Sequence, residues 1–172
     1  SNGVSLGGFQ PKPAIGFWGR RDSYEGWEKR NGHYFLEHYD DWLEFFFPQI
    51  NPEPHSTQAI DSQVGWAKDT TPEVLVQTVP NGDLLPNVPV REAIDRIRCP
   101  VLLIHGDDDR CDPIESSYSL ISARPDWEMA VLEGCGHGVL GRHPVRVNLL
   151  IHEFLNRRLP AGQRTQACNA RA

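Results

Sequence analysis

Two polar segments, each placed after an apolar stretch, carry residue types that suit general base catalysis. One runs from His105 through Gly-Asp-Asp to Asp109 after residues 101–104, and the other, Gly134-Cys-Gly-His137, follows residues 127–132. If both stretches are strands of one parallel sheet, the segments meet at the edge where ligands bind in such sheets. A carboxylate beside an imidazole fixes the ring tautomer and stabilises the imidazolium that forms on proton uptake. The sequence therefore predicts an Asp–His pair at this edge.

The elements that must position the pair follow from the residue pattern. Val101–Ile104 is apolar at every position, as in a parallel strand covered by helices on both faces. Asp112 and Glu115 form a capping-box pattern for the helix that follows, and a second strand is predicted over 127–132. Pro144 then opens a final helix, whose predicted buried face consists of Val147, Ile151, Phe154 and Leu155.

Residues 22–78 predict a series of short helices. Tyr39, Trp42 and Phe46 illustrate an apolar spacing of three to four residues, which suits two amphipathic helices separated near Gly32 and ended by Pro48. Further helix starts are predicted at Ser56, at Thr71-Pro72-Glu73 and at Val90. A block of helices before a strand–helix–strand–helix series fits the last part of an α/β sheet preceded by a lid.

The order of these motifs resembles the α/β-hydrolase family, whose triad follows the chain order nucleophile, acid, histidine. The resemblance covers residues 97–159 and rests on the strand ending at His105, the His-Gly-x-x-Asp109 turn, the helix start after it, and Gly-x-Gly-His137. It implies the α/β fold class, specifically the last strands of a mostly parallel α/β-hydrolase sheet preceded by a helical lid, as an incomplete domain. It also implies that Asp109 is the triad acid and His137 the triad base.

Residue composition and this resemblance together divide the chain into four parts. These are an irregular connector over 1–21, a helical lid or cap region over 22–96, the C-terminal part of the hydrolase core over 97–159 and a disordered tail over 160–172. An aromatic-rich lid suggests a small apolar acyl or alkyl substrate. The alternative is that the aromatic rings only pack the lid onto the body of the domain.

The triad also needs a nucleophile. Gly3-Val-Ser5-Leu-Gly7 matches the G-x-S-x-G elbow, in which a strained strand-to-helix turn presents the serine. Only two residues precede this match, however, and Pro11 and Pro13 follow where a helix is required. We therefore expect the nucleophile to lie ahead of Ser1, with Ser5 as the second candidate. A serine implies an ester, thioester or amide substrate, whereas an aspartate implies an epoxide or a haloalkane.

Other polar residues near the pair have both functional and structural interpretations. His105 could line the substrate pocket or be a hydrogen-bonded structural histidine, and Asp107 and Asp108 could replace Asp109 or form a solvated turn. A calcium site at Asp107, Asp109 and Asp112 lacks the glycine and the bidentate glutamate of an EF-hand loop. Away from the pair, four residues have a spacing that could hold a metal but are interpreted as a solvent-facing polar edge: His33, His38, Asp40 and Asp41. His143 could be mistaken for the base and is interpreted as a capping or surface residue.

Composition limits the remaining functions. The net charge of -6 argues against nucleic acid as a partner, because phosphate binding needs a concentrated basic face. The sequence shows no membrane span, no signal-like start and no nucleotide-binding glycine motif, so we predict a cytoplasmic protein without an organic cofactor or a metal. The widely spaced cysteines are predicted to be reduced thiols: Cys99, Cys111, Cys135 and Cys168.

The function predicted from these residues is hydrolysis of an ester or a related acyl substrate through a nucleophile–His–Asp triad. The alternatives are an epoxide or haloalkane hydrolase with an aspartate nucleophile, and a non-catalytic α/β-hydrolase-like binding module or inactive fragment. The sequence assigns no oligomeric state.

Overall fold

The computed structural model describes residues 16–78 and 90–158, so Ser5, Cys168, the predicted tail and most of the predicted connector lie outside the described residues. None of the helices in these two ranges is both long enough and apolar enough to cross a membrane. The elements in chain order are a 3-10 helix η1 (Gly26–Lys29), α1 (Gly32–Glu37), α2 (Tyr39–Ile50), α3 (Thr57–Ala67), α4 (Pro72–Thr78), α5 (Val90–Arg96), β1 (Leu102–Gly106), α6 (Glu115–Ala123), β2 (Glu128–Leu132), α7 (Val139–Arg142) and α8 (Pro144–Arg158).

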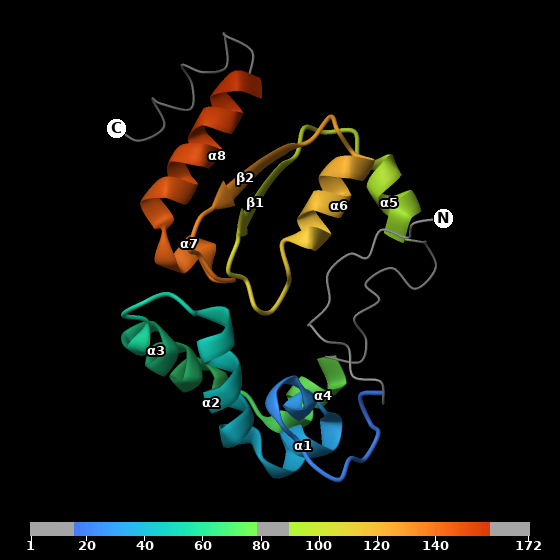
Figure 1. Ribbon diagram of the computed structural model, residues 1–172, viewed down its shortest axis with the longest axis vertical. Coiled ribbons are helices and arrows are strands. Elements are labelled where there is room, and N and C mark those ends of the chain that lie inside the picture. The colour runs from blue at the N-terminus through green and yellow to red at the C-terminus, as the bar shows by residue number, and fades with distance from the viewer. Residues whose placement is uncertain (1–15, 79–89, 159–172) are drawn as a thin grey trace.

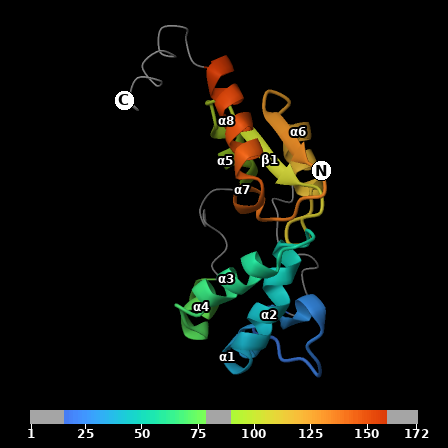
Figure 2. The ribbon, with the colours of Figure 1, turned by 90° about the vertical axis from the view of Figure 1, so that its left-hand side faces the viewer.

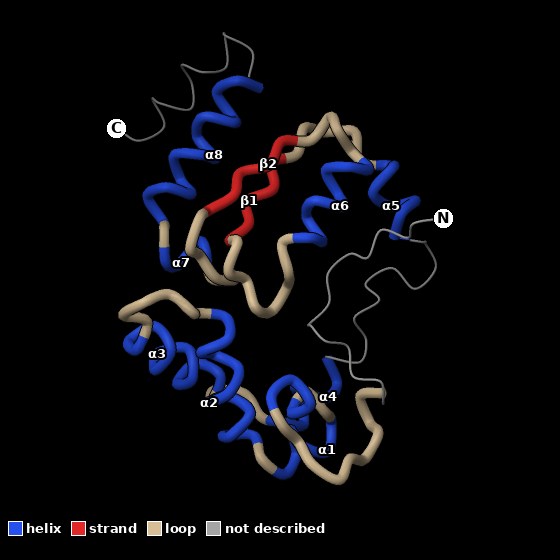
Figure 3. Tube along the Cα trace, in the orientation of Figure 1, coloured by secondary structure: helices blue, strands red, loops and turns tan. Residues whose placement is uncertain are grey.

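The two predicted strands form a parallel pair. Their register runs from Leu102 opposite Glu128 to Gly106 opposite Leu132. The connection between them passes through α6, as a parallel pair requires, and α8 lies on the opposite side of the strands from α6 (Figures 1 and 3). Leu132, Cys135 and Val147 form a small buried core between β2, the loop after it and α8. The strand–helix–strand–helix series predicted from the sequence is confirmed.

The helical block α1–α4 has its own core, built largely from aromatic rings. The rings of Phe35 and Trp42 lie 4.6 Å apart, and those of Trp42 and Phe46 stack at 5.1 Å, measured between centroids. Leu43 and Val76 complete the buried cluster. The spacing that predicted amphipathic helices therefore reflects rings that pack on one another, which favours the packing interpretation of these residues over a substrate-binding one.

Two details of the predicted helices in this block are wrong. The break expected near Gly32 falls at His38, because the side chain of Asn31 accepts hydrogen bonds from His33 N at 2.9 Å and Tyr34 N at 3.3 Å and so starts α1 at Gly32. Pro48 does not end α2, which continues to Ile50. A proline there lacks the N–H for the carbonyl four residues earlier and its ring crowds that carbonyl, but the next turn of helix still forms.

The predicted side-chain caps also differ from the structure. Ser56 precedes α3, but its hydroxyl donates to the carbonyl of Glu53 at 2.6 Å and caps nothing. The capping box at residues 112–115 does not form, and α6 starts only at Glu115. The reason is competition, because Oδ1 of Asp109 already accepts the Asp112 N–H at 2.9 Å that Glu115 would have bound.

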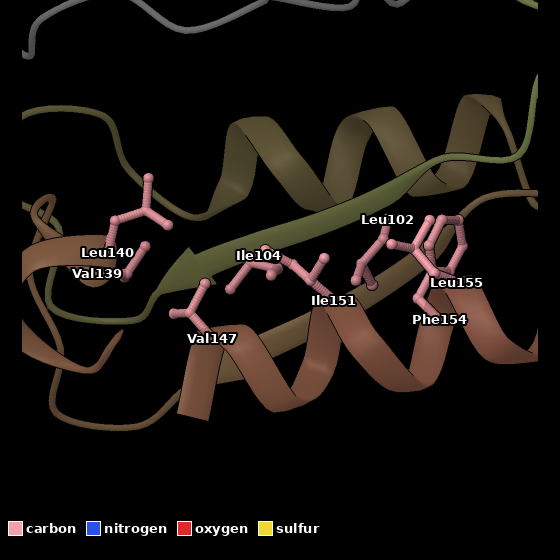
Figure 4. Close-up of a pocket in the computed structure, with 8 residues that line it drawn as sticks. All are labelled: Leu102, Ile104, Val139, Leu140, Val147, Ile151, Phe154 and Leu155. Carbon is pink, nitrogen blue, oxygen red and sulfur yellow. The ribbon is translucent and has the colours of Figure 1, made fainter. Parts of the chain in front are cut away.

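The burial predicted for α8 and β1 holds only in part. Val147 is 1% exposed, but Ile151 is 37% and Leu155 is 47% exposed. Within the described residues, α7, α8 and the near face of β1 leave an apolar groove of about 400 Å³ between them (Figure 4). The side chains that line it are Leu102, Ile104, Val139, Leu140, Val147, Ile151, Phe154 and Leu155.

Candidate active site

Asp109 and His137, predicted to be partners from their places after two strands, are in contact. Asp109 lies three residues beyond the end of β1 and His137 five residues beyond the end of β2. The Nδ1 atom of His137 lies 2.8 Å from Oδ2 of Asp109, across 28 positions of sequence. Because a carboxylate only accepts, Nδ1 carries the hydrogen of this bond. In the neutral ring, Nε2 then holds the lone pair that a general base needs.

Glycines allow the two loops to approach this closely. A Cβ atom on Gly106 would lie 2.2 Å from the carbonyl oxygen of Cys135, a distance that no real Cβ tolerates. The amide of Asp108 donates to the same Cys135 carbonyl at 2.9 Å. Gly134 has a φ of 66°, in the left-handed region that favours glycine, and its N–H donates to Oδ1 of Asp107 at 2.6 Å. The glycines in both motifs therefore bring the loops together.

The carboxylate of Asp109 is buried and satisfied by four donors. Its side chain is 4% exposed. Oδ1 accepts the N–H groups of Cys111 and Asp112, both at 2.9 Å, while Oδ2 faces His137 and also Nε2 of His105 at 3.3 Å. Burial alone would raise the pKa of Asp109, but the hydrogen bonds from His105, His137 and the Asp112 amide together hold that pKa well below its usual range. Asp109 is thus a fixed anion.

The imidazole of His137 is more accessible than its partner. Its side chain is 47% exposed. The hydrogen bond to Asp109 raises the pKa of His137 above the ordinary imidazole value, and this effect exceeds the opposing effect of desolvation. The arrangement stabilises the protonated ring, which is what a base in acyl transfer must become during the reaction.

His105 combines the two interpretations that the sequence left open. Its Nε2 lies 2.8 Å from the carbonyl of Asp112, and its Nδ1 lies 2.7 Å from Oγ of Ser117. The hydrogen bond to Asp109 raises the pKa of His105, again against desolvation. The ring is therefore hydrogen-bonded structurally and also lines a pocket of about 180 Å³, whose walls are Ile104, His105, Gly106, Asp109, Asp112, His137 and Val139.

The competing aspartates are bound elsewhere. Asp107 accepts the Gly134 amide, and Asp108 pairs with Arg110 at 3.2 Å. Among the described contacts, neither of them reaches His137. The spacing that selected Asp109 over its two neighbours therefore agrees with the geometry.

The acidic residues with metal-like spacing have ordinary partners, whereas the buried Nε2 atom of His143 has no hydrogen-bond partner among the described residues. Asp41 accepts from Lys29 and from the Tyr34 hydroxyl, and Asp40 pairs with Lys68 at 3.0 Å. His143 lies at the junction of α7 and α8 and provides the carbonyl that accepts the Val147 N–H. These contacts account for the residues with metal-like spacing near His33 and His38 as surface ion pairs.

Among the residues that the structure describes, one group has the geometry to hold an ion. Single ligand atoms of Asp109, Cys111 and His137 lie within 4.8 Å of one another. Burial raises the pKa of the Cys111 thiol to about 12, and the charges of Asp109 and Asp112 add to this rise. A thiolate, which is the form that binds metals, is therefore disfavoured here. The absence of a metal stays a prediction.

Glu53 is a neighbour of the pair that the residue pattern does not predict. This residue lies in the loop between α2 and α3, and its Oε1 accepts the backbone N–H of Gly136 at 2.8 Å. The two residues are 83 positions apart, and no periodicity links them. The one local signal is an acidic residue between Pro52 and Pro54.

Curated proteins match parts of the chain. The pimeloyl-[acyl-carrier protein] methyl ester esterase of Aromatoleum aromaticum is 35% identical over 73 residues, which cover 42% of this chain and 29% of the esterase. A 2-hydroxy-6-oxononadienedioate/2-hydroxy-6-oxononatrienedioate hydrolase of Burkholderia vietnamiensis is 34% identical over 64 residues, covering 37% of this chain and 22% of that protein. The chain thus matches less than a third of the length of either relative.

Solved structures share the fold at low sequence identity. An esterase from Rhodococcus superposes with a TM-score of 0.55 at 22% identity, over 68% of this chain and 41% of the esterase. A bromoperoxidase from Bacillus anthracis gives a TM-score of 0.61 at 19% identity, over 73% of this chain and 48% of that protein. These similarities confirm the predicted fold class. Residues 3–148 match the sequence model of the Alpha/beta hydrolase family, and the chain belongs to that family.

Proposed function

We propose that this chain supplies the acid, Asp109, and the base, His137, of a hydrolase triad that acts on an ester or a related acyl substrate. The observation that carries the proposal is the 2.8 Å contact between Nδ1 of His137 and Oδ2 of Asp109, formed by loops that follow two neighbouring parallel strands. This edge of an α/β sheet is where such folds bind ligands. The burial of Asp109 and the exposure of His137 suit an orienting anion and a working base.

In the first half of the reaction, His137 Nε2 takes the proton of the nucleophile hydroxyl as its oxygen attacks the acyl carbon. The carbonyl π electrons move to oxygen, and a tetrahedral intermediate forms beside an imidazolium. The intermediate then expels the alkoxide, which receives the proton from Nε2. The products of this half are an alcohol and an acyl-enzyme.

In the second half, water repeats these steps on the acyl-enzyme. His137 Nε2 takes a proton from water as the water oxygen attacks the acyl carbon, and the same proton returns to the nucleophile oxygen as it leaves. Asp109 stays ionised throughout and stabilises each imidazolium through Nδ1–H. The low pKa of Asp109 supports this role, since protonation of the carboxylate would remove the charge.

The nucleophile has two candidate origins. Our preferred one is a residue ahead of Ser1 in a longer polypeptide, because an elbow needs an apolar strand before it and a helix after it. The family match begins at residue 3 and therefore includes Ser5 within Gly3–Gly7, which favours Ser5 as the second candidate. Ser5 lies outside the described residues, so chemical labelling of the protein is needed to distinguish the two candidate nucleophiles.

A small apolar group fits the space beside the base. The pocket that contains His137 and Asp109 is also walled by Ile104 and Val139, and its volume of about 180 Å³ suits a short acyl or alkyl group. One relative is by name a methyl ester esterase, which supports an ester substrate. Another acts by name on oxo-dienedioates, which supports a related acyl substrate.

We further propose that residues 22–96 act as a lid over residues 97–159. The helical block lies beside the loops that follow β1 and β2 in both views of the ribbon (Figures 1 and 2). The carbonyl of Ile50 accepts the His137 N–H at 3.1 Å, so the block touches the segment that carries the base. A helical cover at this position would limit access to the pocket.

The cytoplasm remains the proposed location. Cys99, Cys111 and Cys135 are free in the described part of the chain, which suits a reducing compartment. Fractionation of cells followed by immunoblotting tests this point.

The experiment that tests the function compares His137→Ala with His152→Ala in the full-length protein, using p-nitrophenyl esters of short acids. His152 is an exposed histidine on α8 and serves as the control. We expect His137→Ala to lower kcat by about 10⁶-fold, as removal of the base does in serine proteases, and His152→Ala to change it little. Unchanged turnover in His137→Ala would exclude His137 as the base, whereas absence of turnover in the wild type would favour the non-catalytic binding module.

A fluorophosphonate probe then identifies the nucleophile. The serine oxygen displaces fluoride from phosphorus, and mass spectrometry of the labelled peptide shows whether the label is on Ser5 or on another serine. His137-dependent hydrolysis of an epoxide or a haloalkane, without any labelled serine, favours the aspartate nucleophile.

A further inference from the structure

Among the described residues, one short segment of the helical block holds the loop that carries His137. Residues 50–54 run from the last residue of α2 into the loop before α3 and are called here the clamp segment. They contact the histidine loop through both backbone and side chain. The carbonyl of Ile50 accepts the His137 N–H at 3.1 Å, and Oε1 of Glu53 accepts the Gly136 N–H at 2.8 Å. The helical block therefore fixes the backbone N–H groups of Gly136 and His137, the two amides that precede the His137 side chain.

The fit between the two segments leaves little freedom. A Cβ atom on Gly136 would lie 2.3 Å from Cδ of Pro52 and 2.9 Å from the Ile50 carbonyl oxygen. Asn51, which is buried, donates from Nδ2 to the Phe47 carbonyl at 3.0 Å and to Gln63 Oε1 at 2.7 Å. The clamp segment is thus anchored to α2 and α3 and pressed against the histidine loop.

Glu53 is unusual within this contact because it is an ionisable group placed in the interface. Its side chain is 6% exposed, and its second oxygen, Oε2, has no hydrogen-bond partner. The nearest cation among the described ion pairs is Arg142, with Nε at 3.9 Å from Oε2. Arg142 also donates to the Pro54 carbonyl at 3.2 Å, which ties α7 to the clamp segment. A buried carboxylate with one amide donor and one distant cation is costly to keep for packing alone.

We propose that Glu53 is a positioning residue for the triad, which sets the orientation of His137 toward Asp109 through the Gly136 amide. This inference rests on the proposed function for its catalytic meaning. Glu53 touches neither the substrate nor the reacting atoms. It acts through the peptide next to the base, so that the helical block and the base move as one unit. Displacement of the helical block then disturbs the His137–Asp109 contact.

The test compares Glu53→Ala with Glu53→Gln in the full-length protein. Both variants remove the charge, but glutamine keeps a carbonyl oxygen that can accept the Gly136 N–H, whereas alanine does not. Glu44→Gln, an exposed carboxylate on α2, is the control for charge loss within the helical block. We expect Glu53→Ala to lower kcat by about 10²-fold with little change in KM, as a misplaced catalytic group does, and Glu53→Gln to restore most of it.

A second measurement follows the His137 imidazole directly by NMR titration and needs no activity. The groups that act on its pKa are Asp109, Asp112 and His105. Loss of the Glu53 charge is common to both variants, so a lower His137 pKa in Glu53→Ala than in Glu53→Gln reports a weaker contact with Asp109. Equal pKa and equal kcat in the two variants would overturn the inference, and so would a loss of kcat that only follows a loss of folded protein.

These outcomes stay separate from those of the proposed function. If His137→Ala keeps full turnover, the proposed function fails, but the difference in His137 pKa between the two Glu53 variants still tests the positioning role. If His137→Ala is inactive and both Glu53 variants match the wild type in kcat and pKa, only the positioning role fails.

Discussion

The Nε2 atom of His105 lies 3.3 Å from Oδ2 of Asp109, the same oxygen that binds Nδ1 of His137 at 2.8 Å. One carboxylate oxygen therefore serves two imidazoles, and the other oxygen accepts two backbone amides. Since every donor to Asp109 favours its ionised form, the acid is held in both charge and direction. A substitution of either histidine or of Asp109 should thus alter the hydrogen bonds and the ionisation of the other two groups.

Replacing Asp109 by asparagine should remove most activity while leaving the site assembled. The amide oxygen can still accept the Cys111 and Asp112 N–H groups, but the amide nitrogen then faces His137 and donates to Nδ1. The hydrogen of the neutral ring moves to Nε2, which can no longer act as a base. We expect kcat to fall by about 10⁴-fold, the effect of this change in a serine protease.

The same variant should shift the pH dependence of whatever activity remains. The Asp109 hydrogen bond raises the pKa of His137, so in the wild type kcat/KM rises with pH through a value above that of ordinary imidazole. Without the carboxylate, the rising limb of this pH profile moves to lower pH. Asp108→Asn, which removes a neighbouring exposed charge paired with Arg110, is the control and should leave both kcat and the limb unchanged. A wild-type pH profile in Asp109→Asn would show that Asp109 is not the triad acid.

His105→Gln should weaken the fold in a pH-dependent way. The hydrogen bond to Asp109 raises the pKa of His105 in the folded protein above its unfolded value, which is about 6.5. The protonated ring therefore stabilises the fold fully below pH of about 6.5, and this contribution disappears as the pH rises through the folded pKa. The free energy of unfolding lost in His105→Gln should be larger at pH 5 than at pH 9, as measured by urea denaturation. A loss that does not vary with pH would mean that the ring acts only through its bonds to Ser117 and to the Asp112 carbonyl.

Asn31→Ala should destabilise the helical block more than an ordinary cap replacement does. The buried Asn31 side chain accepts the His33 and Tyr34 N–H groups and donates from Nδ2 to the Gly19 carbonyl at 2.8 Å. Loss of an N-cap costs about 1 kcal/mol, and the partly buried Gly19 carbonyl left unpaired adds up to about 1–3 kcal/mol. Thermal unfolding by circular dichroism measures the total. A loss below about 0.5 kcal/mol, the scale of surface substitutions, would mean that water replaces these bonds.

The sequence predicts the α/β part of the chain better than the contacts of the helical block. Strands and the Asp109–His137 pair follow from local signals: an apolar run, a glycine-containing turn and the rule that parallel strands share an edge. The contact between Glu53 and Gly136 has no such signal, since it joins segments 83 positions apart through a backbone amide that any sequence carries. The predicted capping box failed for a related reason, because the Asp112 amide had a competitor in Asp109 that lies outside the box pattern.

Gly106→Ala should be the most damaging of the single-methyl changes near the site. The added Cβ would lie 2.2 Å from the Cys135 carbonyl oxygen and 2.5 Å from that of Gly136, and backbone atoms cannot move aside as a flexible side chain can. Overpacking of this kind costs about 1–3 kcal/mol, and here it also pushes the His137 loop away from Asp109. We therefore expect a lower denaturation midpoint together with a fall in kcat.

The matched control for that change is Gly141→Ala in α7, where an added Cβ meets nothing within 4 Å. Alanine in a helix is better than glycine by about 0.5–1 kcal/mol, so this variant should be as stable as the wild type or slightly more so, with normal turnover. If Gly106→Ala behaved like Gly141→Ala, the two loops would not be in the close contact that brings acid and base together. Because the clash involves only backbone atoms, that result would count against the geometry of the whole site, whichever residue proves to be the nucleophile.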